Sequence, residues 1–249
     1  MKALVTGASS GIGRDIAYYL SDIGYDLVLV ARDEKGLEET RNNCKTNCDI
    51  VSLDLSDTSN CYKLYEDYKD KIDVLVNGAG FGLFGVTAKT DLDTELKMID
   101  LNIKAVHILT KLFLKDFIKK DSGYIMNIAS SAGFLAGPRL NTYYATKNYV
   151  AKWTMAIYEE LRHENSNVHI CTLCPGPVDT NFNKVAGGKF TVKALSSEYV
   201  SKYAVDKMFK KKLIIVPGFT MRVGLFLNRF IPWKLSMRFV YGIQKRKSK

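Results

Sequence analysis

The sequence feature that most constrains the fold is a glycine-rich segment placed directly after the first predicted strand. An apolar run at residues 3–5 leads into Thr6-Gly7-Ala8-Ser9-Ser10-Gly11-Ile12-Gly13, where a helical stretch begins. Glycine permits a tight turn and a close backbone approach, and the N-terminus of a helix favours a bound negative charge. A G-x-x-x-G-x-G pattern alone also fits a turn without a ligand. Its place between a strand and a helix favours a dinucleotide.

Short apolar runs alternate with amphipathic stretches along most of the chain. The runs are predicted to be strands, and the stretches between them have the spacing of helices that bury one face. Asp33 is well placed to cap a helix start, and Gly24 to end a helix. Strands and helices in alternation imply right-handed crossovers and a parallel sheet covered on both faces. The predicted strands are 3–5, 26–30, 49–53, 74–77, 123–128, 168–173 and 213–216, and the predicted helices are 11–24, 33–43, 58–69, 94–119 and 142–163.

This alternation predicts an α/β fold with a single doubly wound parallel sheet of about seven strands and helices on both faces. The chain has 249 residues, 47% of them hydrophobic and 25% charged, which excludes a disordered or collagen-like chain. We divide it into a domain at residues 1–218 and a basic amphipathic extension at residues 219–249. The apolar runs are too short to span a bilayer, and the first residues read as a strand rather than a secretory leader. A cytoplasmic protein is therefore predicted.

The net charge of +10 comes from the C-terminal part of the chain. After Asp206 there is no acidic residue, while twelve Lys and Arg follow, so 24 basic and 26 acidic residues leave the first 206 positions at −2. Four of these cations recur one or two helical turns apart among large apolar residues: Arg222, Arg229, Lys234 and Arg238. This pattern, with Trp233 as an anchor, is typical of a segment in a membrane interface. The alternative, which we rank first, is that the apolar face packs on the domain or on a second subunit.

Cysteine and histidine give no sign of a disulfide framework or a metal site. Five cysteines, an odd number without a secretory context, predict reduced thiols. Cys171 and Cys174 match C-x-x-C, but residues 168–174 read as a buried strand, where positions three apart point to opposite faces. Core packing explains this pair better than redox chemistry does. The three histidines have no ligand spacing, so we assign no metal, and no motif or basic groove points to nucleic acid.

An arginine follows the second predicted strand, where the adenosine ribose of a dinucleotide would lie. An acidic residue there accepts hydrogen bonds from the ribose 2′-hydroxyl, whereas a basic residue accommodates a 2′-phosphate. Arg32 has a planar guanidinium that suits a phosphate. It also fits a solvated surface residue, and Asp33 beside it blurs the signal. We predict NADP, with NAD as the alternative.

A tyrosine and a lysine open a long helical stretch near the middle of the chain. Tyr143 and Lys147 are four residues apart, so the phenol and the ammonium project from one face of a helix. A nearby cation favours the phenolate and brings the pKa of a phenol, ordinarily about 10, closer to neutral. A general acid/base for a carbonyl–alcohol pair needs such a group. Taken alone, Y-x-x-x-K also fits a surface pair.

These elements occur together with further motifs in a fixed order. Asn77-Gly78-Ala79-Gly80 follows the fourth predicted strand, Ser130 lies thirteen residues before Tyr143, and Pro175-Gly176-Pro177-Val178-Asp179-Thr180 follows the sixth strand. With them, residues 1–218 resemble the classical short-chain dehydrogenase/reductase family. The resemblance implies a Rossmann-type fold, a nicotinamide cofactor and hydride transfer.

The resemblance assigns four catalytic residues. Tyr143 would be the acid/base, and Lys147 would lower its pKa and bind the nicotinamide ribose. Ser130 would hydrogen-bond the substrate oxygen. Asn102 would hold a water that relays protons to Lys147.

Two neighbours compete for these roles. Ser131 adjoins Ser130, and the surrounding Ala-Ser-Ser-Ala-Gly frame favours Ser130. Tyr144 is the competing phenol, three residues from the lysine, and the family pattern alone favours Tyr143. Gly78 departs from the family pattern, because the family usually has a second asparagine at this position. This difference bears on the rigidity of the loop that holds Gly78.

The resemblance also assigns the cofactor contacts. Asp54, which ends the third predicted strand, would meet the adenine, and Val178 and Thr180 would contact the carboxamide end. The predicted cofactor residues are Gly7, Ser9, Ser10, Gly11, Ile12, Gly13, Arg32, Asp54, Asn77, Ala79, Gly80, Tyr143, Lys147, Pro175, Gly176, Val178 and Thr180.

Residues 181–206 correspond to the variable substrate lid of the family. They hold Phe182, Val185, Phe190, Val192 and Leu195, with Gly187-Gly188 as a possible hinge. Apolar residues near the nicotinamide favour a hydrophobic ketone or secondary alcohol, which could be lipid-like, 3-oxoacyl or steroid-like. We therefore predict an NADP-dependent oxidoreductase that forms a homodimer or homotetramer. The alternative is a membrane-surface protein that binds NADP(H) as a sensor or structural ligand.

Overall fold

The computed structural model describes residues 1–182, 186–187 and 194–247. Within these residues seven strands form one sheet in the order β3-β2-β1-β4-β5-β6-β9, and each neighbouring pair is parallel. This confirms the predicted doubly wound sheet, since the chain moves outward from β1 in one direction and from β4 in the other. The strands are β1 Lys2–Thr6, β2 Asp26–Ala31, β3 Cys48–Ser52, β4 Val74–Asn77, β5 Tyr124–Ile128, β6 His169–Leu173 and β9 Ile214–Ile215.

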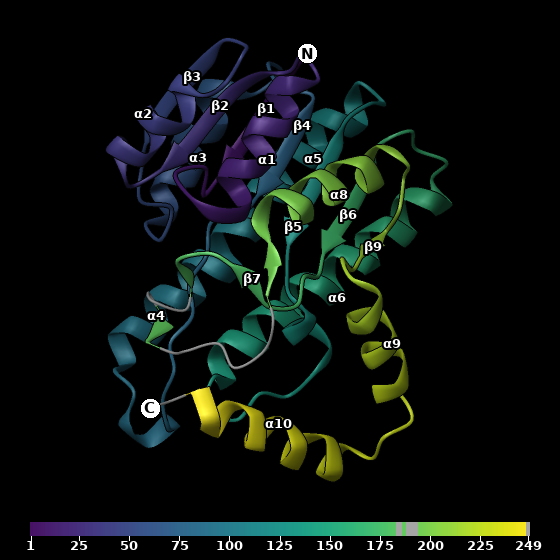
Figure 1. Ribbon diagram of the computed structural model, residues 1–249. Helices are drawn as coiled ribbons and strands as arrows, with labels where there is room; N and C mark the ends of the chain where they lie inside the picture. The colour runs from purple at the N-terminus through teal and green to yellow at the C-terminus, as the bar shows by residue number, and fades with distance from the viewer. Residues whose placement is uncertain (183–185, 188–193, 248–249) are drawn as a thin grey trace.

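Helices cover both faces of this sheet (Figure 1). One face is covered by α1 (Gly11–Asp22), α2 (Glu34–Asn42) and α8 (Ser197–Phe209). The other face is covered by α3 (Thr58–Tyr68), α5 (Val106–Lys119) and α6 (Asn141–His163). Three more helices, α4 (Leu92–Ile99), α9 (Phe219–Asn228) and α10 (Trp233–Lys247), lie beyond the carboxyl ends of the strands in Figure 1.

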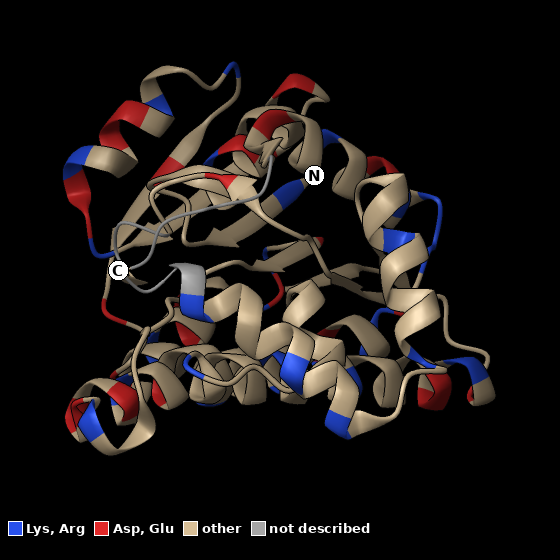
Figure 2. Ribbon diagram, turned by 60° about the horizontal axis from the view of Figure 1, so that its bottom comes forward, with Lys and Arg blue, Asp and Glu red and all other residues tan. Residues whose placement is uncertain are grey.

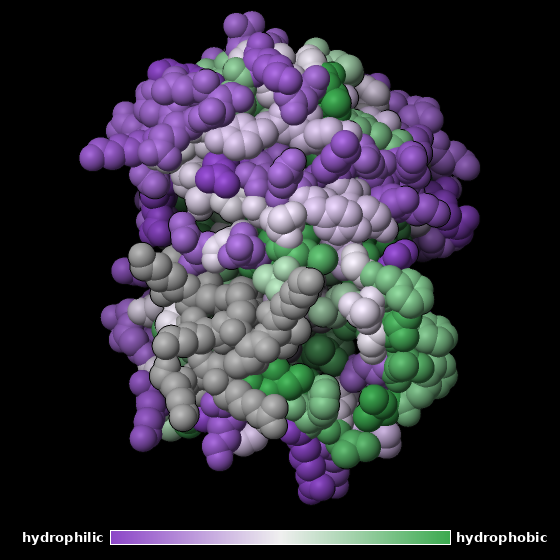
Figure 3. Space-filling view, in the orientation of Figure 1, coloured by the Kyte–Doolittle hydropathy of each residue, from purple (hydrophilic) through white to green (hydrophobic). Residues whose placement is uncertain are grey.

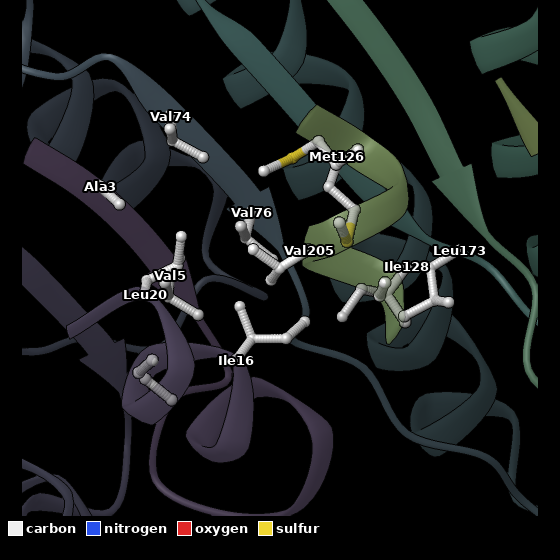
Figure 4. Close-up of a cluster of buried hydrophobic side chains, with 14 of the residues drawn as sticks. Ala3, Val5, Ile16, Leu20, Val74, Val76, Met126, Ile128, Leu173 and Val205 are labelled. Atoms are coloured by element: carbon white, nitrogen blue, oxygen red, sulfur yellow. The ribbon is translucent and has the colours of Figure 1, made fainter. Parts of the chain in front are cut away.

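The central strands are apolar at nearly every position because both of their faces are buried. Leu4 packs in the cluster beneath α3, α5 and α6, whereas Val5 packs in the cluster beneath α1 and α8. Leu75 and Val76 of β4 divide in the same way. Figure 4 shows Val5 and Val76 beside Ile16 of α1 in the second cluster. A strand buried on both faces loses the polar–apolar alternation of a surface strand.

The two predicted signals for helix ends are confirmed. The Asp33 carboxylate accepts the Gly36 N–H at 3.2 Å at the start of α2. Gly24 follows the end of α1 with φ of +90°, a left-handed conformation that glycine adopts without strain. The observed bounds of the predicted strands and of the helices α1, α2, α3 and α6 differ from the predicted ones by at most two residues at either end, within the usual uncertainty of element ends, and β4 has the predicted bounds.

The single helix predicted over 94–119 is more complex in the structure. Helix α4 begins at Leu92, capped by the Asp91 carboxylate, and continues through a π-helical segment, Asp100–Ala105, into α5. The wider π turn changes the direction in which side chains project, and Asn102 lies within it. Periodicity predicts the helix but not the local change in its winding.

The lid predicted over 181–206 is partly wrong. Residues from 197 onward form α8, whose Val200, Ala204 and Met208 are fully buried against the sheet and α1. Leu195 lies in a short strand, β8 (Leu195–Ser196), paired with β7 (Val178–Asp179). A buried helix and a paired strand belong to the core framework rather than to a hinged segment. Val185, Gly188, Phe190 and Val192 lie outside the described residues.

The cysteines of the C-x-x-C pattern lie in the hydrophobic core. Cys171 and Cys174 are buried and free, in two different hydrophobic clusters, and burial raises the pKa of the Cys174 thiol to about 12. Packing in the core, as predicted, accounts for both.

Among the described helices, none has the length and apolar character needed to cross a bilayer.

Candidate functional site

A cavity of about 450 Å³ opens at the carboxyl ends of the parallel strands. Its wall is built from the loops that follow β1, β2, β3, β4, β5 and β6. The strand order reverses between β1 and β4, so the loops after these two strands run to opposite sides and leave a crevice. Its volume is in the range of small-molecule sites.

The glycine-rich segment forms part of the cavity wall, and its glycines bring the backbone close to neighbouring segments. Gly7 has φ of +71°, and a β-carbon there would lie 2.8 Å from the Ala79 nitrogen. A β-carbon at Gly13 would lie 2.3 Å from the Gly7 carbonyl oxygen. No side chain caps the start of α1 at Ser10, so the first N–H groups of the helix stay available for an anion. These residues fit the pyrophosphate of a dinucleotide.

Thr6 joins this segment to the loop after β4. Its hydroxyl oxygen accepts the Gly78 N–H at 3.0 Å and the Ala79 N–H at 3.2 Å. Side chains larger than hydrogen would not fit at Gly78, where a β-carbon would lie 2.6 Å from the Thr6 carbonyl oxygen. The glycine that departs from the family pattern is therefore held by its neighbours, and the loop is fixed.

Arg32 and Asp54, the two residues predicted to meet the adenosine of a cofactor, face each other in the wall of the cavity. The guanidinium and the carboxylate are 3.6 Å apart, with the two side chains 66% and 44% exposed. Partial desolvation opposes ionisation of Asp54, but hydrogen bonds from Ser56 and the charge of Arg32 lower its pKa overall. The Asp33 carboxylate caps α2 by accepting the Gly36 N–H, so it is engaged with the helix and not with Arg32.

Tyr143, Ser130 and Lys147 meet on the wall at the centre of the cavity. Tyr143 is 9% exposed and lies in the first turn of α6, and Lys147 lies one turn further on the same side. Burial raises the pKa of Tyr143, while a side-chain hydrogen bond with Ser130 acts in the opposite direction. The Ser130 oxygen also accepts the Ala132 N–H at 3.1 Å.

The Lys147 ammonium is held within the protein. Its Nζ donates to the Ile128 carbonyl oxygen at 2.7 Å and lies 5.9 Å from the centre of the Tyr143 ring. Burial lowers the pKa of Lys147 to about 8. The lysine is thus a desolvated cation beside a desolvated phenol.

Two predicted residues do not line the cavity. The Asn102 amide donates to the Phe81 carbonyl oxygen at 2.9 Å and to the Thr146 hydroxyl at 3.1 Å, and its oxygen accepts the Phe81 N–H. Asn102 therefore ties the loop after β4 to α6. Asn77 is also buried, and its amide donates to Thr110 and Asn127. Both amides support the walls from behind.

All the other predicted site residues line this cavity, from Gly7 after β1 to Thr180 after β6. Ser131 lines it too, but Ser130 is the serine whose side chain lowers the pKa of Tyr143. The Tyr144 hydroxyl accepts a hydrogen bond from the Gln244 amide at 2.7 Å. The two tyrosines thus have different partners, which sequence spacing alone did not distinguish.

The sequence did not predict a contribution from the C-terminal extension to this cavity. Gln244 of α10 is 2% exposed and lines the cavity beside Tyr144. Ser236, Val240 and Gln244 are the buried positions of α10, spaced four residues apart. This four-residue spacing could have indicated from the sequence that the helix packs on the domain with one side. It does not indicate which part of the domain the helix contacts. One face of the extension therefore packs on its own domain.

Comparison with known proteins decides the family. The sequence model described as short chain dehydrogenase matches residues 1–189. The chain is a short-chain dehydrogenase/reductase. It is therefore an oxidoreductase of a family that binds NAD(P).

Relatives and solved structures support the same family and fold. The very-long-chain 3-oxoacyl-CoA reductase of Rattus norvegicus is 27% identical over 256 residues, covering 98% of this chain and 81% of the relative. A short-chain dehydrogenase from Sphingobium yanoikuyae in complex with NADPH is 24% identical with a TM-score of 0.83, covering 92% of this chain and 93% of that one. A short-chain dehydrogenase/reductase from Burkholderia phymatum in complex with NAD is 22% identical with a TM-score of 0.83, covering 92% of each chain. At these identities the two structures bear on the fold alone.

Proposed function

We propose that this oxidoreductase transfers a hydride between NADP(H) and a hydrophobic ketone or secondary alcohol. The placement of Tyr143 carries the proposal: a buried phenol that lines the same cavity as Ser130, Lys147 and the glycine-rich segment. Apolar rings gather around it, and the Phe182 ring centre lies 5.1 Å from that of Tyr143. Phe81, Phe84 and Leu140 line the same cavity. Apolar walls around the reactive phenol favour a substrate whose carbonyl is flanked by hydrocarbon.

The residues divide the chemistry between them. When bound, a nicotinamide cofactor would supply the hydride-transfer chemistry at the substrate carbon, in either direction. Reduction of a ketone also needs one proton at the carbonyl oxygen, and the Tyr143 hydroxyl would donate it. The Ser130 hydroxyl, which lines the cavity with Tyr143, would hold the same oxygen in place. In alcohol oxidation the Tyr143 oxygen takes the proton back.

Lys147 acts through its charge and its position. Burial raises the pKa of Tyr143. A cation one helical turn from the phenol would favour the phenolate and so oppose this effect. The bond to the Ile128 carbonyl keeps the ammonium in place, and the same ammonium would bind the ribose of the nicotinamide. A β-carbon at Gly80 would lie 2.9 Å from Asn102 Oδ1 and 3.5 Å from Lys147 Nζ. Both atoms therefore lie close to Gly80, and this proximity supports the proposed proton relay between Asn102 and Lys147.

The preference for NADP rests on Arg32. Its only ion pair among the described residues is with Asp54, and exposed pairs of this kind contribute little. A 2′-phosphate would compete with the Asp54 carboxylate for the guanidinium and could engage it by two parallel hydrogen bonds. The glycine-rich segment, Ala79 and the 175–180 segment would hold the rest of the dinucleotide.

The direct test is turnover of NADPH with a panel of hydrophobic ketones by wild type, Tyr143→Phe and the matched control Tyr144→Phe. Removal of the proton donor is expected to reduce kcat at least a hundredfold. Tyr143→Phe should still bind NADPH, since the phenol is one of many cofactor contacts. Turnover that is unchanged in Tyr143→Phe contradicts the mechanism. If wild type binds NADPH but reduces no ketone, the alternative role as a sensor or structural NADP(H)-binding protein is favoured.

We also propose that the protein is cytoplasmic and forms a homodimer or homotetramer. All five cysteines are free, which supports a reducing compartment. On the outer side of α5 and α6, the His107 ring stacks on Trp153 with centres 4.2 Å apart, and Tyr149 is 37% exposed. Such an aromatic surface supports contact with a second copy. Light scattering on the eluting protein gives its mass, and a monomer at micromolar concentration would overturn the proposed assembly.

A further inference from the structure

The exposed apolar surface of the protein is concentrated in the C-terminal extension. Eleven of the twenty-one large hydrophobic side chains exposed in the described part of the chain lie within residues 219–241. Figure 3 shows hydrophobic residues gathered on the side where Figure 1 places α9. Concentrated apolar surface of this kind marks an interaction site.

Helix α9 exposes its apolar face instead of burying it. None of its residues is buried, and the large apolar side chains recur at positions that share one side of the helix. They continue into the corner before α10 with the same spacing: Phe219 (72% exposed), Val223 (38%), Phe226 (56%), Leu227 (54%) and Phe230 (73%). Arg222 and Arg229 lie along the edge of this stripe, seven residues apart. Long cationic side chains at such an edge can keep their charge in water while their stems cover apolar surface.

Helix α10 separates a buried side from an outer side. Ser236, Val240 and Gln244 are buried: Gln244 contacts Tyr144 of α6, and the Ser236 hydroxyl donates to the Asn228 side chain of α9 at 2.7 Å. Lys234 and Arg238, also four residues apart, fall on the opposite side of the helix by its 3.6-residue period. Exposed apolar residues flank these two cations: Leu235, Met237, Phe239 and Tyr241. The outer side is therefore basic along its centre and apolar along both edges.

The charge of this surface selects its partner. Residues 207–249 contain no Asp or Glu, so α9 and α10 carry only blue bands in Figure 2. Two copies of this chain meeting face to face through α9 and α10 would bring like charges together, which disfavours a symmetric dimer here. Exposed aromatic residues with cations at their edges suit the interface of a membrane that carries negative headgroups.

We propose that α9 and α10 form a docking surface, made by the exposed side chains of residues 219–241, for an anionic lipid bilayer. The helices lie on the bilayer, because neither has the length and apolar character to cross it. Phe219, Phe226 and Phe230 enter the acyl boundary, and Trp233, 66% exposed at the start of α10, sits at headgroup level. The arginines and Lys234 contact lipid phosphates.

Co-sedimentation of the full chain with lipid vesicles tests this proposal. Binding is expected to vesicles that contain about one-third phosphatidylglycerol, to weaken in high salt, and to be much weaker with pure phosphatidylcholine. Arg222→Gln and Arg238→Gln should each lower the partition coefficient about fivefold. Phe226→Ser with Phe230→Ser should remove most of the binding to either vesicle. The matched control is Tyr62→Ser with Lys63→Gln, an exposed pair on α3, which should bind as wild type does.

Circular dichroism of each variant confirms that the fold is retained before binding is compared. Absence of wild-type binding to the anionic vesicles overturns the proposal, as does equal loss of binding in the α3 control. A dimer that dissociates in the Phe226→Ser, Phe230→Ser variant would assign the surface to a second copy instead. Each of these results is independent of whether the enzyme reduces a ketone.

A second observation concerns the inner side of α10 and rests on the proposed function. Gln244 is buried in the wall of the cavity, its Nε2 donates to the Tyr144 hydroxyl, and its Oε1 has no partner among the described residues. A buried polar atom left without a partner is unfavourable, so it discriminates between ligands that can and cannot hydrogen-bond to it. We infer that Gln244 is a specificity-determining residue that accepts a hydrogen bond from a hydroxyl or amide N–H on the apolar substrate.

Pairs of hydrophobic ketones test this inference. One member of each pair carries a hydroxyl or an amide N–H away from the carbonyl, and in the other member that group is methylated. Wild type should favour the donor-bearing ketone by about tenfold in kcat/KM, and Gln244→Leu should reduce this ratio to about one. A wild-type ratio of one, with both ketones reduced, overturns the role of Gln244 and leaves the proposed function intact. If wild type reduces no ketone, the proposed function fails first and the role of Gln244 fails with it.

Discussion

Replacement of Arg32 by alanine should remove the preference of the protein for NADPH over NADH. The Arg32 guanidinium lies on the cavity wall, 3.6 Å from the Asp54 carboxylate, and both side chains are partly exposed. Alanine at this position takes away the cation that would face a 2′-phosphate. NADH has no phosphate there, so its binding depends on the other contacts in the cavity.

The size of the effect follows from these two interactions. A hydrogen bond between a guanidinium and a phosphate contributes about 1.5–3 kcal/mol. An exposed ion pair such as that of Arg32 with Asp54 contributes about 0.2–1 kcal/mol, which binding of the phosphate would forfeit. The difference, about 0.5–3 kcal/mol, corresponds to a loss of NADPH affinity of about twofold to a hundredfold. The dissociation constant for NADH should change by less than about twofold.

Titration calorimetry with both cofactors measures these constants directly. Arg32→Lys should lie between wild type and Arg32→Ala, because an ammonium keeps the charge without the planar pair of donors. Arg41→Ala is the matched control, an arginine that is paired with Glu38 on α2 and does not line the cavity. Equal affinity of wild type for NADPH and NADH would refute the assignment of the phosphate to Arg32. A parallel loss of both affinities in Arg32→Ala would refute the geometry of the site.

Further predictions concern the loop, the lysine and the core. Gly13→Ala should lower the affinity for NADPH and for NADH equally, by at least about tenfold, because its β-carbon would lie 2.3 Å from the Gly7 carbonyl oxygen. Gly242 has open space around it in α10. Gly242→Ala should therefore raise the free energy of unfolding in urea by up to about 1 kcal/mol. Burial lowers the pKa of Lys147 to about 8 from its ordinary 10.5, so the unfolded chain binds the proton more tightly and the free energy of unfolding should rise with pH between these values. Lys147→Met should lack this rise when the two proteins are compared at each pH, and an identical pH dependence would contradict the shift. Phe113→Ala, at a fully buried position between the sheet and α5, should lower the free energy of unfolding by about 3–5 kcal/mol, and a loss below about 1 kcal/mol would show that the cluster is loosely packed.

The sequence by itself determined the features that depend on residues close together in the chain. The glycine-rich segment, the cap at Asp33 and the stop at Gly24 act within one or two turns of a helix, so their residue types are sufficient to place them. Apolar runs likewise placed the seven strands of the sheet. The motif order then predicted the family, which the comparisons confirm.

The tertiary structure alone decided which of these residues meet. The partner of Tyr144 is Gln244, one hundred positions later in the chain. Helix α8, whose first residues the sequence predicts as part of a lid, packs against α1 in the core. Asn102 projects from a π turn, whose altered winding shows no period in the sequence. Contacts between distant residues depend on how whole elements pack, and packing is selected by the combined shape and burial of many side chains. A residue pattern with a period of a few positions cannot carry that information.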